Sequence, residues 1–156
     1  MFPEMTNLKP DSQLQDKAAL RWSRLEDEDG ACVVVSDRME LVYINAAAVE
    51  LVAGSWFGKR CFEVLPVVDE ACAFHCPKIR AVNESGEVVY CEESVMVENG
   101  GRKVFGVGLI PLGPRSDDHA RAVLLLRAKD ASTDDSAFRA QLLADATSLA
   151  RRISAA

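Results

Sequence analysis

The chain has 156 residues, 49% of them hydrophobic, and a formal net charge of -6 with a sequence pI near 5.0. This size suits one domain with its own core, and the acidic balance argues against direct nucleic-acid binding, which needs clustered Lys and Arg. Residues 1–5 lack the regions of an export signal and no apolar run reaches membrane-spanning length, so we expect a cytoplasmic chain without membrane contact.

The first expected element is an amphipathic helix within residues 1–29. Asp11 or Ser12 can cap it, and apolar residues follow at helical spacing, namely Leu14, Ala18, Trp22 and Leu25. The acidic run at 26–29 and Gly30 end the helix, and its carboxylates are interpreted as a solvated face or caps. One narrow apolar stripe is typical of a docking or dimerisation surface.

Two strands and a short helix are expected next. Residues 32–35 and 41–44 are rich in β-branched side chains and are joined by a polar turn at 37–38. Asn45 follows the second strand and is a predicted cap of a short helix over residues 46–53.

A further helix is predicted from the position of a proline. Proline suits the first helical position, and the residue before it is disfavoured in helical conformation. Cys76 is therefore a predicted cap of a helix that runs from Pro77 to about Glu84, and Gly86 closes it.

Three strands and a terminal helix complete the order. The strands are expected at 87–98, 102–112 and 120–127, and Asn-Gly-Gly at 99–101 is a strong hairpin signal between the first two. A helix over 136–154 carries an apolar face made of Phe138, Leu142, Ala146, Leu149 and Ile153. The order predicts an α+β domain around a five-stranded antiparallel sheet, with short helices on one face and amphipathic helices at both ends.

That order, together with the segments "VVVSDRMELVYINAAAVELVAG", "GKRCFEVLP" and "ESGEVV", resembles the PAS family of sensor domains over residues 30–130. The resemblance implies a PAS fold and a non-enzymatic sensor that holds a ligand or cofactor between its sheet and its short helices. It also implies a homodimer through the flanking segments 1–29 and 131–156. Residues 131–156 would form a signalling helix that passes the signal to an output kinase or transcription-factor module.

Four cysteines resemble those of PAS sensors that carry an iron–sulfur cluster: Cys61, Cys72 and Cys76, spaced C-x10-C-x3-C, and Cys91 on the following strand. Four thiolates are the ligand set that such a cluster requires. The resemblance implies that these residues bind the cofactor metal in a sensor of oxygen or redox state. Cys91 shares a strand face with Val89 and Val95, the expected core face, although Glu93 interrupts it.

The cysteines allow two other interpretations. One is a reversible thiol switch without metal. Cys76 is expected at the positive N-terminal end of a helix, beside Lys78 and Arg80, and this positive charge favours the thiolate form of Cys76. The other is a small-molecule-binding or dimerisation module in which the cysteines only pack. Cys32, which is flanked by apolar residues, is interpreted as a core residue.

The sequence matches the binding sites of other cofactors only in part. Haem through His75 or the Cys76-Pro77 pair is an alternative. Zinc is disfavoured because C-x10-C is long for a structural site, and flavin because the residues around Cys61 differ from the light-sensing motif. No phosphate loop or catalytic triad occurs in the sequence. Loss of the cluster is expected to relax residues 58–77, and the sheet would carry this change to the terminal helix.

Overall fold

The computed structural model describes residues 21–28, 30–36, 38, 40–50, 57, 84–96, 102–112, 120–129 and 134–154. The start of the first expected helix and most of the helix predicted over 77–84 lie outside these residues. Within the described part of the chain, no helix is long and apolar enough to cross a membrane.

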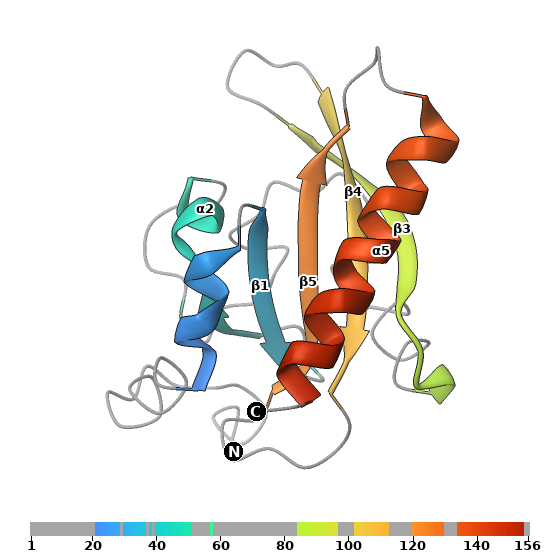
Figure 1. The fold of residues 1–156 in the computed structure, drawn as a ribbon. Helices are drawn as coiled ribbons and strands as arrows, with labels where there is room; N and C mark the ends of the chain where they lie inside the picture. The colour runs from blue at the N-terminus through green and yellow to red at the C-terminus, as the bar shows by residue number, and fades with distance from the viewer. Residues whose placement is uncertain are drawn as a thin grey trace.

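The described elements form one sheet with helices packed on it (Figure 1). In chain order they are η2 (Ser23–Asp27), β1 (Ala31–Ser36), β2 (Leu41–Ile44), α2 (Ala46–Val49), β3 (Val89–Met96), β4 (Arg102–Pro111), β5 (Ala120–Ala128) and α5 (Asp135–Ser154). The five strands lie in the order β2-β1-β5-β4-β3, and every neighbouring pair is antiparallel. The predicted α+β class and five-stranded antiparallel sheet are confirmed.

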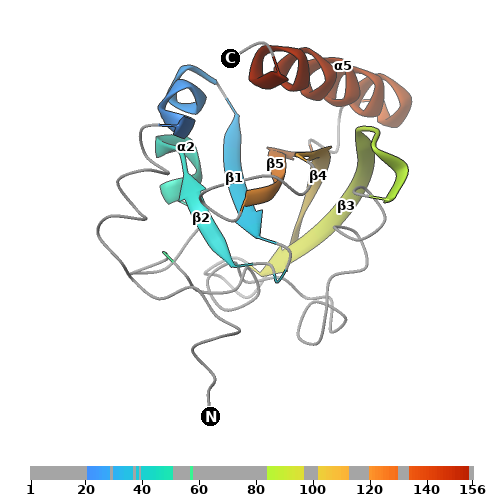
Figure 2. The same ribbon diagram turned by 90° about the horizontal axis from the view of Figure 1, so that it is seen from below.

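The two faces of the sheet have different partners because successive side chains of a strand point to opposite sides. We call them the Cys91 face and the α5 face. The Cys91 face contains the apolar cluster that α2 joins, with Val33, Val35, Leu41, Ile44, Phe105, Val107, Leu109, Ala122, Leu124 and Leu126. On the opposite face lie η2 and α5 (Figure 2). The path of α5 is diagonal across the strands (Figure 1). All six residues of β1 are buried, since both of its faces are covered.

Local signals set the ends of the elements. The hydroxyl of Ser36 accepts hydrogen bonds from the backbone N–H groups of Arg38 and Glu40, both at 3.2 Å, and closes the predicted turn between β1 and β2. Gly86 has φ of 70°, a left-handed conformation that glycine adopts without steric cost, at the point where the sequence predicted a helix end.

The apolar stripe of α5 packs on the sheet of its own chain. Four residues of the stripe are buried in the cluster on the α5 face, namely Phe138, Leu142, Ala146 and Leu149. They approach β4 where its α5-facing positions are Gly106 and Gly108. A Cβ atom added to Gly108 would lie 2.8 Å from Cβ of Ala146. The missing side chains of these glycines therefore allow the helix to lie close to the strand. Dimerisation through the terminal helices stays a prediction.

Candidate functional site

Of the four predicted ligands, the structure describes Cys91 alone. Cys61, Cys72 and Cys76 lie outside the described residues. Cys91 is on β3, opposite Val107 of β4, is half-buried and packs against the cluster of the Cys91 face, next to Val89. This matches its predicted place on the core face of the strand. No group of three or more His, Cys, Asp or Glu that could hold a metal occurs among the described residues.

Cys32 lies on the other face of the sheet and does not share a site with Cys91. Its side chain is fully buried in the α5-face cluster, which also contains Leu25 of η2. Burial, with the nearby carboxylate of Glu28, raises the pKa of the Cys32 thiol to about 12. A protonated, enclosed thiol is a poor nucleophile and a poor metal ligand, so the interpretation of Cys32 as a core residue agrees with its position.

The raised pKa gives a labelling prediction. At pH 8 this raised pKa keeps the Cys32 thiol protonated, whereas a thiol at the ordinary value of 9.0 is partly ionised. We expect iodoacetamide to modify Cys91 faster than Cys32 in the folded protein, and both at similar rates in guanidinium, as measured by peptide mass spectrometry. Rapid labelling of Cys32 in the folded protein would contradict the burial.

The raised pKa also predicts how stability depends on pH. Because only the unfolded chain releases the Cys32 thiol proton between about pH 9 and 12, the free energy of unfolding falls over that range.

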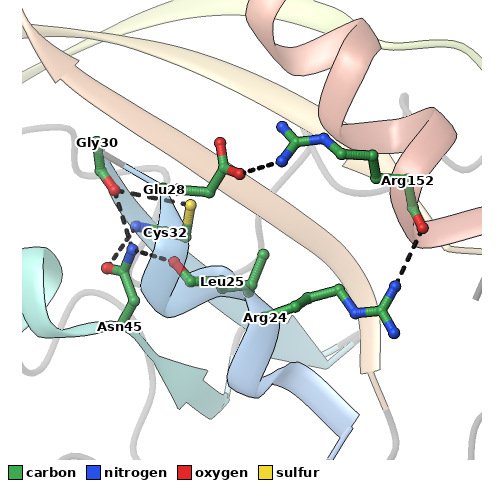
Figure 3. Close-up of polar contacts among 7 residues, drawn as sticks. All are labelled: Arg24, Leu25, Glu28, Gly30, Cys32, Asn45 and Arg152. Atoms are coloured by element: carbon green, nitrogen blue, oxygen red, sulfur yellow. Dashed lines mark hydrogen bonds and ion pairs between the residues drawn. The ribbon is translucent and has the colours of Figure 1, made fainter.

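Asn45 is 1% exposed and forms hydrogen bonds through both polar atoms of its side chain (Figure 3). Its Oδ1 accepts hydrogen bonds from the backbone N–H groups of Cys32, at 2.9 Å, and Ala48, at 3.1 Å. Its Nδ2 donates to the carbonyl oxygens of Leu25, at 2.9 Å, and Gly30, at 3.0 Å. The predicted cap is thus confirmed, and the same amide also holds β1 and the segment that contains η2.

The acidic run at residues 26–29 has specific partners. Glu26 accepts a hydrogen bond from the backbone N–H of Ala46 at 2.8 Å and another from the hydroxyl of Tyr43. Burial and this second bond raise the pKa of Tyr43. Glu26 therefore joins η2 to the start of α2. Its side chain is exposed and accepts a backbone N–H at a helix start, so it agrees with the interpretation of the run as a solvated face or caps.

Glu28, in the same run, binds the C-terminal end of α5. Its carboxylate is 2.5 Å from Nη1 of Arg152. Arg24, in η2, donates to the backbone carbonyl of Arg152 at 3.2 Å (Figure 3). The two contacts attach one turn of α5 to η2. No sequence signal links these residues, because Glu28 and Arg152 are 124 positions apart.

The N-terminal end of α5 is attached through β5. Lys129 forms ion pairs with Glu92 of β3, at 3.1 Å, and with Asp135 of α5. Tyr90 donates to Glu92 at 2.8 Å, and desolvation together with this bond raises its pKa to about 12. Asp134 accepts a hydrogen bond from the backbone N–H of Ala137 at 2.9 Å and caps the helix. These contacts fix α5 at both ends.

Comparison with solved structures identifies the fold. A d2 variant of RsLOV matches with a TM-score of 0.61 and 18% identity, over 93% of this chain and 84% of that one. A PAS domain from a two-component sensor histidine kinase matches with a TM-score of 0.51 and 16% identity, over 76% and 100%. Vibrio cholerae VqmA bound to DPO matches with a TM-score of 0.55 and 20% identity, over 72% of this chain and 58% of that one.

These structures share the fold at low sequence identity. No protein-family model matches the chain, and no curated protein has a significant match to it. The structural similarity therefore confirms the PAS fold that the sequence segments predicted and leaves function to be argued from the residues.

Proposed function

We propose that this chain, which has the PAS fold, is a sensory domain that responds to oxygen or redox state through Cys61, Cys72, Cys76 and Cys91. In this proposal the four thiolates hold an iron–sulfur cluster, which would supply an oxygen-sensitive or redox-active centre when bound. The supporting observation is the position of Cys91, half-buried on the sheet face away from α5. Its neighbours there are apolar, a setting that limits the access of water to a bound group.

The proposal extends to the output. One similar structure is a domain of a sensor histidine kinase, and VqmA has been solved in a complex with DNA. By analogy, we propose that this domain acts as a homodimer and that α5 passes the signal to a kinase or transcription-factor module. The domain itself is proposed to be non-enzymatic.

The test is the metal content of protein purified without oxygen. We expect iron and acid-labile sulfide, with a visible absorption band, in the wild type and in Cys32→Ala, and a strong loss of all three in Cys91→Ala. Cys32→Ala is the matched control because it removes a thiol from the opposite face of the sheet. A colourless wild type that resists anaerobic reconstitution, or an equal loss in both variants, would contradict the cluster.

A second candidate is a small-molecule sensor. The buried side chains described on the Cys91 face form an apolar cluster, which suits an organic ligand, and the similar VqmA structure has DPO bound. Native mass spectrometry of iron-free protein would distinguish the remaining alternatives. A co-purified organic mass supports this candidate, whereas ligand-free protein whose reactive thiols decrease reversibly with mild oxidant supports a thiol switch without metal.

A further inference from the structure

We infer that η2 couples the two faces of the sheet around its β2–β1 edge, by linking α2 on the Cys91 face to the C-terminal end of α5 on the other face. The sequence suggested transmission through the sheet, whereas hydrogen bonds join η2 to Asn45, to α2 and to α5. The ribbon shows η2 at the side of the sheet where β1 and β2 lie (Figure 2). The inference goes beyond the proposed function, because it holds for any signal that moves α2.

The first half of the route joins α2 to η2. Ala48 of α2 is buried in the cluster of the Cys91 face, and its backbone N–H is held by Asn45. The amide of Asn45 also holds the carbonyl of Leu25, whose side chain is buried in the cluster of the opposite face. A displacement of α2 therefore acts on η2 through a side chain whose hydrogen-bonding groups all have partners on neighbouring segments.

Glu26 gives this half a second connection. It reaches from η2 to the backbone N–H of Ala46, the first residue of α2, at 2.8 Å. Two independent contacts thus fix the orientation of η2 relative to α2, and not only its distance. A single contact would act as a pivot and transmit little rotation.

The second half joins η2 to α5. Glu28 and Arg24 lie just after and within η2, and both contact Arg152, one through its guanidinium group and one through its carbonyl oxygen. Arg152 lies in the last turn of α5, where the carbonyl groups have no intrahelical partners. Movement of η2 therefore acts directly on the C-terminal end of α5.

The structure of η2 itself makes it a suitable connecting element. It is a 3-10 helix, which has poorer hydrogen-bond geometry than an α-helix. Its position depends on Trp22 and Leu25 in the core and on the partners described above. An element held by its neighbours on both sides responds to a change on either side.

The test is amide hydrogen exchange by NMR on the full chain. Arg152→Ala is expected to raise the exchange rates of the Ala48 and Val49 amides about threefold, the effect of losing one partly exposed ion pair. The control is Arg151→Ala, which removes an exposed arginine that makes no ion pair with the described residues. Unchanged exchange in α2, with faster exchange confined to α5, would overturn the coupling.

Coupling must also act in the reverse direction. Glu26→Gln weakens the contact between η2 and α2, and it is expected to raise exchange at the Arg152 and Ile153 amides. Asp27→Asn, which changes the neighbouring exposed carboxylate, is expected to leave them unchanged. The Leu124 amide at the centre of the sheet reports global opening. If the exchange rate of the Leu124 amide changes as much as those of the reporter amides in α2 and α5, the contacts contribute only to overall stability and the inference is wrong.

Discussion

Replacing Asn45 with alanine is expected to lower the free energy of unfolding by about 3 kcal/mol, since it removes a helix cap and leaves several enclosed backbone groups without partners. The groups affected are the N–H groups of Cys32 and Ala48 and the carbonyl oxygens of Leu25 and Gly30. Water cannot replace the lost bonds without entering a site that is 1% exposed. Urea unfolding followed by circular dichroism measures the change.

The control for Asn45→Ala is Gln141→Ala. Gln141 carries the same kind of amide on the exposed side of α5, where it donates one hydrogen bond to Asp145 at 2.9 Å. Its loss is expected to cost less than about 0.5 kcal/mol, as for most surface substitutions. If the two variants lose the same stability, the four bonds of Asn45 do not contribute as the structure indicates.

Gly108→Ala is expected to lower the free energy of unfolding by about 2 kcal/mol, through overpacking between β4 and α5. The added Cβ would lie 2.8 Å from Cβ of Ala146, an atom fixed to the helix backbone, so α5 itself has to move. This strain outweighs the smaller gain that alanine usually brings over glycine in the unfolded state. Urea unfolding measures the loss, and a change in near-ultraviolet circular dichroism would report repacking around Phe138.

Two further variants test the reason for this effect. Gly30→Ala is the control, because its added Cβ would meet the flexible end of Leu125 at 3.2 Å, and a small loss is expected. Ala146→Gly removes the opposing Cβ, so the double variant with Gly108→Ala should lose less stability than the sum of the single changes. Additive losses would mean that contact between β4 and α5 is not the cause.

Some of the site followed from local sequence signals. Asn45 after a strand and before a run of alanines predicted a cap, and the structure confirms it. Alternation in the strand containing Cys91 placed this residue on the core face, where the structure has it. Cys32 among apolar neighbours was interpreted as a core residue, and it is fully buried. In each case the property depends on residues a few positions away, so the local sequence is sufficient.

The contacts of the acidic run at 26–29 did not follow from such signals. Charged runs usually face solvent, and the partners of Glu28 and Glu26 lie 124 and 20 positions further along the chain. The close packing of β4 against α5 was not predicted from the sequence either. Gly106 and Gly108 matter because they contact α5, which follows only after another whole strand. The ligand set that includes Cys61, Cys72 and Cys76 stays a prediction.

Local sequence patterns predicted the five strands, their order along the chain, the terminal helix and the PAS fold, since strand alternation, helix caps and glycine turns act over short distances. The packed fold was needed to place Cys91 on one face of the sheet and Cys32 on the α5 face, and to show that η2 contacts both α2 and the end of α5. These relations depend on the order of the strands in the sheet and on the path of α5 across it. Both are set by packing among segments distant in sequence, so no local pattern encodes them.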